Sequence, residues 1–123
     1  MTTMIQDKDG KTAAKPSTMP SDRHFRNAWV FNSDASAITE DVAEAKKIFQ
    51  DKIREVRAPL LEAEDVVYMK ALEADDASAK TASVAKKKKL RDAPAASAIS
   101  SADTIAKLKA AWDEDVLGTS PYK

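Results

Sequence analysis

A long run of apolar residues at helical spacing is the feature that most constrains how this chain folds. Between residues 39 and 76 the apolar side chains recur in steps of three and four, which is the spacing of one helix face. They are Val42, Ala45, Ile48, Phe49, Ile53, Val56, Leu60, Ala63, Val67 and Ala71. Thr39 is a candidate N-cap. Pro59 interrupts the pattern, so the stretch is either one kinked helix or two helices that meet near Arg57–Pro59.

Two rows within this stretch repeat every seven residues, as the seam of a coiled coil does. The rows are Val42, Phe49, Val56, Ala63 and Ile53, Leu60, Val67. This repeat predicts self-association or docking onto another helix. Pro59 argues against a long unbroken coiled coil, and packing within a small helical bundle is the alternative.

Two neighbouring segments carry opposite net charge. Residues 39–76 carry 6 positive and 11 negative side chains, net −5, whereas residues 77–92 carry 6 positive and 1 negative, net +5. The second segment is helical in composition as well, and Pro94 ends it. A short turn at Asp75–Asp76 between two helices of opposite charge predicts an antiparallel helical hairpin over residues 39–92.

The two ends of the chain carry weaker signals. Residues 1–20 are polar, contain two prolines and a glycine, and show no periodicity, so they predict an extended arm. Residues 93–123 predict an Ala/Ser linker and then a helix that starts at Ser100 or Ser101 and stops at Gly118. Together with the hairpin, these segments predict an all-α fold. We expect an elongated helical hairpin, or a small helical bundle or coiled coil, with an extended N-terminal arm.

Aromatic residues make up only 6% of the chain, and several of them gather in residues 21–38. The segment Ala28–Phe31 fits either a short turn or a short strand, and Asn32–Asp34 fits a turn. Large aromatic side chains are core anchors in a monomer, but they are interface anchors in an assembly protein with few bulky residues. On the second hypothesis the predicted partner-binding residues are Phe25, Trp29, Phe31, Phe49, Ile53, Leu60, Val67 and Trp112.

The composition argues against most kinds of active site. The chain has no cysteine, which excludes disulfides, thiolate metal sites and cysteine nucleophiles, and its 2 glycines leave no phosphate-binding loop. Its one histidine, His24, has no nucleophile at catalytic spacing. The carboxylates of residues 62–73 lack the histidine that a metal site in a helical bundle requires. We therefore expect no enzymatic activity, no cofactor and no bound metal.

The charge balance and hydropathy bear on location and partners. Lys and Arg number 20 and Asp and Glu number 20, which disfavours a nucleic-acid partner. No apolar run approaches the length that spans a bilayer, so we expect no membrane partner. Residues 1–19 contain no apolar signal-peptide core, so we expect a product of the cytosol, which includes particles assembled there.

Several motifs resemble those of a group of small phage proteins. Residues 21–29 are SDRHFRNAW, which resembles the DRxFRxAW opening of small proteins from the tail regions of tailed, chiefly marine and environmental, bacteriophages. Residues 54–74 are similar to their RxxRxPLLxAxDVxxxxALE stretch. Residues 88–92, KKLRD, resemble their KxxLRD element, and residues 108–112, LKAAW, resemble their LKAxW element.

The resemblance implies a virion structural protein rather than an enzyme. Such a protein makes protein–protein contacts with other components of the tail, its fibres or the neck, as a homo-oligomer or within a hetero-assembly formed in the host cytoplasm. The KxxLRD element also occurs in tail-fibre assembly chaperones, where a Pro-rich tail with Trp-Pro follows. This chain has Ala93–Ala96 at that place. A tail-fibre assembly chaperone that is not retained in the particle is therefore the alternative.

Overall fold

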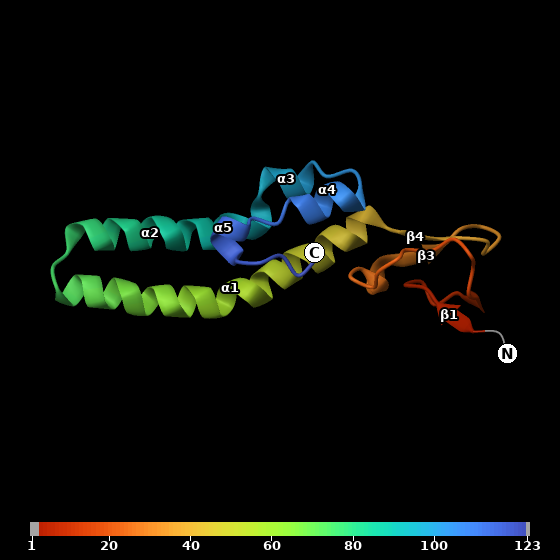
Figure 1. Cartoon of the computed structure of the whole chain (residues 1–123), viewed down its shortest axis with the longest axis horizontal. Helices are drawn as coiled ribbons and strands as arrows, with labels where there is room; N and C mark the ends of the chain where they lie inside the picture. The colour runs from red at the N-terminus through yellow and green to blue at the C-terminus, as the bar shows by residue number, and fades with distance from the viewer. Residues whose placement is uncertain (1–2, 123) are drawn as a thin grey trace.

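The computed structural model describes residues 3–122 and shows an elongated, mostly helical molecule (Figure 1). Two antiparallel helices run along most of its length: α1 (Val42–Glu73) and α2 (Ala77–Asp92). The C-terminal helical segments are η2 (Ala93–Ala95), α3 (Ser97–Ser100), α4 (Ile105–Ala110) and α5 (Glu114–Leu117). These segments pack near the first half of α1, so the outer half of the hairpin projects alone.

The N-terminal part of the chain is β-structure, so the all-α prediction is wrong. Its elements are β1 (Met4–Gln6), β2 (Thr12–Ala14), η1 (Arg26–Ala28), β3 (Trp29–Phe31) and β4 (Ile38–Glu40). β1 pairs antiparallel with β2, and β3 pairs antiparallel with β4, in two separate two-stranded sheets. The fold is therefore mostly helical with two small antiparallel sheets at one end of the molecule (Figure 1).

Asp7 explains why residues 1–20 do not form the extended arm that their composition predicts. Its buried carboxylate accepts backbone N–H bonds from Asp9 and Lys11, which close the turn between β1 and β2. It also accepts the N–H of Phe31 at 3.1 Å, which ties this hairpin to β3. The Phe31 bond is the main reason that the pKa of Asp7 lies below its ordinary value.

α1 passes through Pro59 as one helix. Its N-cap is Asp41 and not Thr39, because the Asp41 carboxylate accepts the N–H groups of Ala43 and Glu44 while Thr39 lies within β4. Pro59 is exposed, so the carbonyl that loses its helical hydrogen bond lies on the solvated side of the helix. Figure 1 shows that α1 bends near its middle.

The single C-terminal helix predicted to start at Ser100 or Ser101 is divided into shorter pieces. The Thr104 side chain accepts a backbone N–H at the start of α4, and the Asp113 side chain does the same at the start of α5. Each cap begins a new helix, so the direction of the chain changes between them. Gly118, at φ 84°, ends α5 at the position where the sequence predicts a stop.

Apolar side chains form two cores. The junction core lies where α1, α2 and the C-terminal segments meet, and its buried members are Phe25, Ala28, Ala45, Phe49, Ile53, Leu90, Ile99, Ala102, Leu108, Trp112 and Leu117. The smaller strand core consists of Trp29, Phe31 and Ile38. Neither core has a fully buried member between Ile53 and Leu90. The outer half of the hairpin therefore lies outside both cores.

Candidate protein-binding surface

The distal hairpin, which we define as residues 60–88, has a thin interface between its two helices. Ala71 and Ser83 are buried there, and the Ser83 hydroxyl donates to the Glu64 carbonyl oxygen at 3.3 Å. Small side chains allow two helices to approach closely, but they remove little apolar area from water. The distal hairpin therefore receives little of its stability from the contact between its own two helices.

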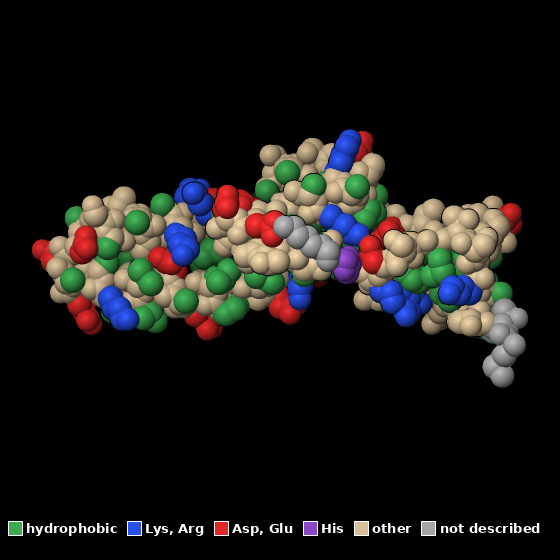
Figure 2. Space-filling view, viewed as in Figure 1, with side chains coloured by type: hydrophobic (Ala, Val, Ile, Leu, Met, Phe, Trp, Pro, Cys, Tyr) green, Lys and Arg blue, Asp and Glu red, His purple; other side chains and the backbone are tan. Residues whose placement is uncertain are grey.

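Large apolar side chains remain exposed on this part of the molecule. They are Leu60, Val66, Val67, Met69, Leu72 and Val84, and each is between 36% and 54% exposed. Elsewhere within residues 3–122 only Met4 is a large, exposed apolar residue. Figure 2 shows apolar side chains spread along the distal hairpin among acidic and basic ones. Exposed apolar area concentrated in one element is typical of an interaction surface.

The exposed side chains on α1 surround the helix rather than forming one narrow stripe. At 3.6 residues per turn, Leu60 and Val67 lie on one flank of the buried Ala71, Leu72 lies on the other flank, and Met69 faces away from α2. A helix with apolar residues around most of its circumference is normally covered from several sides. Here α2 covers one side only.

One exposed flank continues a row that is buried in the first half of α1. Phe49 and Ile53 lie in the junction core, whereas Leu60 and Val67, on the same side of the helix, are 36% and 47% exposed. A heptad row shifts by only about 20° per heptad around a straight helix. The C-terminal segments cover the row in the first half, whereas in the second half the neighbouring α2 covers it only in part.

Ion pairs link the two helices of the distal hairpin. Lys86 lies 3.5 Å from a carboxylate oxygen of Glu64, and Lys87 lies 2.6 Å from one of Asp65. The Lys87 ammonium also lies 4.7 Å from the ring centre of Tyr68. One partner in each pair is largely buried, since the Glu64 side chain is 8% exposed and that of Lys87 17% exposed. The pairs hold the acidic α1 against the basic α2 without covering the apolar side chains beside them.

The structure divides the predicted partner-binding residues among three places. Four lie in the junction core: Phe25, Phe49, Ile53 and Trp112. Two lie in the strand core: Trp29 and Phe31. Two are exposed on the distal hairpin: Leu60 and Val67. Of this set, only the last two offer apolar surface to a partner in the structure described here.

Four exposed side chains on the distal hairpin were not among the residues that the sequence singled out. They are Val66, Met69, Leu72 and Val84. The sequence did contain a signal for those on α1: these large apolar residues lie outside the row that repeats in steps of three and four. A helix buried on one side only has polar residues at such positions.

The remaining candidate chemistry is sparse. His24 Nδ1 lies 3.5 Å from an Asp22 carboxylate oxygen, and the His24 ring packs edge-on against Tyr122 at a centroid distance of 5.2 Å. Within residues 3–122 no three acidic or histidine side chains are grouped in a way that fits a metal ion. No helix in the described part of the chain is long and apolar enough to cross a membrane.

The distal hairpin is thus the candidate site, and the evidence for it is the exposure of its apolar side chains. No protein-family model, curated protein or solved structure matches this chain.

Proposed function

We propose that this chain is a non-enzymatic structural protein of a phage tail, fibre or neck, and that its distal hairpin binds another protein chain in the virion. The main observation in favour of this contact surface is that large apolar side chains are exposed on the two projecting helices. The phage setting is supported by the resemblance of residues 21–29 and 54–74 to proteins of tail regions.

Energetics favour a covered state of the distal hairpin. Full burial of one large aliphatic side chain contributes roughly 1.5–3 kcal/mol. Covering the exposed remainder of all six side chains would supply on the order of 5 kcal/mol, and one helix on the Leu60 and Val67 flank would cover only part of that surface. That gain is similar to the lower range of the cost of association, about 4 kcal/mol. A partner must therefore contribute apolar surface of its own, which a helix with an apolar face does.

The geometry also indicates what shape of partner fits. α4 and α5 cover the first half of the apolar row on α1, together with the end of α2. Leu60 and Val67 continue that row beyond the C-terminal segments. A helix of another chain, a second copy or a different tail protein, would extend the same layer along the hairpin.

The test replaces two exposed residues of the apolar row and measures how much of the variant chain is incorporated into phage particles. Leu60→Glu combined with Val67→Glu puts charge on the contact flank without touching either core. We expect mass spectrometry of purified particles to show loss of the variant, while circular dichroism of the isolated variant stays helical. Ala58→Glu is the matched control, because Ala58 is exposed on α1 and belongs to neither core.

Two results would count against this proposal. Equal incorporation of the double variant and the Ala58→Glu control would exclude the distal hairpin as the contact surface. Absence of the wild-type chain from finished particles, with fibre assembly failing when the gene is deleted, would instead support the tail-fibre assembly chaperone.

A further inference from the structure

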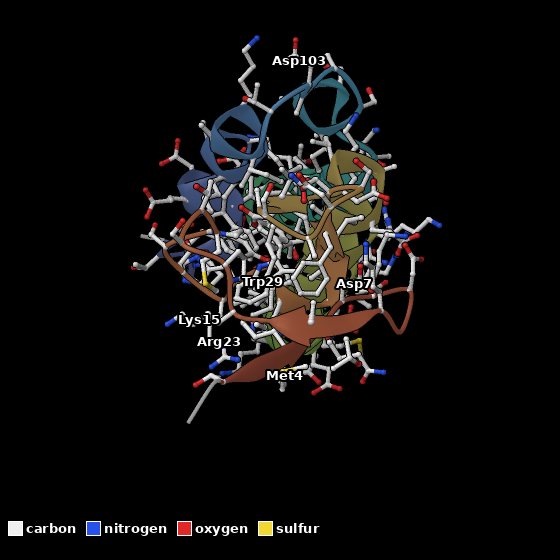
Figure 3. All side chains as sticks on the ribbon, turned by 90° about the vertical axis from the view of Figure 1, so that its right-hand side faces the viewer. Met4, Asp7, Lys15, Arg23, Trp29 and Asp103 are labelled. Carbon is white, nitrogen blue, oxygen red and sulfur yellow. The ribbon has the colours of Figure 1, made fainter. Side chains whose placement is uncertain are left out.

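A pocket opens at the opposite end of the molecule, beside the first β-hairpin. It is formed by residues 3–6, 15–17 and 19–21 together with Arg23, Arg26 and Trp29, and its volume is about 660 Å³. Figure 3 shows Lys15 and Arg23 on one side of the strands, with Asp7 on the other side. The β1 strand that lines the pocket lies at the opposite end of the molecule from the tip of the distal hairpin (Figure 1).

The pocket is cationic. Lys15, Arg23 and Arg26 line it, and no aspartate or glutamate does. Within the described part of the chain none of these three side chains forms an ion pair. Many other basic side chains in the molecule do pair with a carboxylate, as Lys109 does with Asp22 at 2.6 Å. Three unpaired cations around one hollow favour the binding of an anionic group.

Trp29 holds the two arginines in place. The centre of its ring lies 4.6 Å from the Arg26 guanidinium carbon and 5.8 Å from that of Arg23, and its side chain is almost fully buried. Arg26 also donates to the Gln6 carbonyl oxygen at 2.5 Å. A guanidinium that stacks on an aromatic ring keeps its N–H edge accessible, so Arg23 and the N–H groups of Arg26 that do not bond Gln6 can meet a planar oxyanion. The arginines are therefore oriented for a carboxylate or a phosphate before any ligand arrives.

The main chain of β1 adds peptide-binding groups to the same pocket. The Lys15 N–H donates to the Thr3 carbonyl oxygen, so the odd-numbered residues of the strand face β2. The main-chain groups of Met4 and Gln6 then face the other way, where the Gln6 carbonyl oxygen meets Arg26. Among the described residues β1 pairs as a strand with β2 alone. On its other edge Arg26 bonds the Gln6 carbonyl oxygen, and the N–H of Lys8, just after the strand, donates to the Trp29 carbonyl oxygen at 2.9 Å, so the open part of this edge is at Met4. A strand edge of this kind is a template for an extended peptide.

We propose that this pocket binds an extended acidic peptide segment of a partner protein, whose aspartate or glutamate carboxylates contact Arg23, Arg26 and Lys15. The open main-chain groups of Met4 on the outer edge of β1 favour a peptide over a nucleic acid. Single-stranded nucleic acids are normally held by bases stacked on open aromatic faces, and Trp29 is buried with two guanidinium groups already against it. The site does not depend on the distal hairpin.

The test measures fluorescence anisotropy of a fluorescein-labelled peptide that contains four consecutive glutamates, titrated with the full-length chain. We expect saturable binding that weakens as salt is added, and no binding of the same peptide with glutamines in place of glutamates. Arg23→Gln combined with Lys15→Gln should weaken binding by about tenfold or more, as expected for the loss of charged hydrogen bonds. Neither side chain donates a hydrogen bond within the described structure, so the variant should keep its fold.

Lys70→Gln is the matched control, since Lys70 is an exposed cation on α1 without an ion pair in the described structure. It should leave peptide affinity unchanged, as should the Leu60→Glu and Val67→Glu pair. Equal weakening in Lys70→Gln, or no binding of the glutamate peptide by the wild-type chain, would overturn the inference. Tighter binding of a single-stranded oligonucleotide or of inorganic phosphate than of the peptide would overturn it as well.

Discussion

Phe49 and Val67 lie on the same side of α1, yet Phe49 is fully buried and Val67 is nearly half exposed. The first half of the helix is covered by α4, α5 and the ring of Tyr122, which stacks on Phe49 at a centroid distance of 5.4 Å. Among the described residues, the second half packs chiefly against α2, through small side chains such as Ala71 and Ser83. Helical periodicity therefore defines which side of a helix is apolar, while distant parts of the chain decide whether that side is covered.

The two halves should therefore differ in stability as well as in exposure. The junction core contains ring contacts such as Phe49 against Trp112, at a centroid distance of 5.8 Å. The distal hairpin contains a thin interface of small side chains and ion pairs in which one partner remains exposed. Parts of a protein with few buried apolar contacts open most easily. Three experiments test this difference, in order of decreasing effect.

The largest loss of stability is expected when a buried residue of the apolar row is shortened in the first half of α1. Phe49→Ala should lower the free energy of unfolding by about 3–5 kcal/mol, because it leaves a cavity in the junction core. Val67→Ala is the matched change on the same side of the helix, and it should lower that free energy by less than about 1 kcal/mol in the isolated chain. Urea titration followed by circular dichroism measures both. Similar losses for the two variants would remove the distinction between the halves.

A smaller loss of stability is expected when Tyr122, which packs against the junction core, ionises at high pH. Burial, with a further contribution from the charge of Glu55, raises the pKa of Tyr122 to about 12. A raised pKa means that the stabilisation is complete below about pH 10, the unfolded value, and is lost as pH rises towards 12. Since the side chain is only half buried, we expect a loss of about 1–2 kcal/mol.

The matched variant for this titration is Tyr122→Phe, which keeps the ring and removes the ionisable hydroxyl. The stability of the wild type relative to Tyr122→Phe, measured by thermal melts, should fall between pH 10 and pH 12. A constant difference across this range would show that the Tyr122 hydroxyl has the same pKa in the folded and unfolded chain.

The smallest effect is expected in the distal hairpin. The Asp76 carboxylate accepts the Ala79 N–H at 3.0 Å and caps α2. Asp76→Ala should destabilise this helix by about 1 kcal/mol, so hydrogen exchange at residues 77–88 should accelerate about fivefold. Amides near Phe49 should exchange at the wild-type rate. Equal acceleration in both regions would mean that the hairpin and the junction core open as one unit.

The helices were predictable from local signals, and the strands were not. The apolar row from Val42 to Ala71 and the opposite charges of residues 39–76 and 77–92 indicate two paired helices without reference to the rest of the chain. β1 and β2 have three residues each, and the N–H that ties their turn to β3 belongs to Phe31, 24 positions from Asp7. A contact over that separation has no periodic signature in the sequence.

The candidate site was predictable only where its residues belong to a periodic pattern. Leu60 and Val67 were singled out because they belong to the heptad rows. Phe25 and Trp112 were singled out by size, but both lie in the junction core because the chain returns to α1 after Pro94. The cationic pocket depends on the stacking of Arg23 and Arg26 on Trp29, which spacing along the sequence does not reveal.

The passage of α1 through Pro59 without a break has a mechanical consequence. Its 32 residues form a helix of roughly 48 Å, which is held in the junction core at one end and lies outside both cores at the other. Such a helix acts as a lever, because a sideways pull on its free tip produces a torque at the anchored end. A load applied to the tip would therefore be borne by the packing around Phe49 and Trp112.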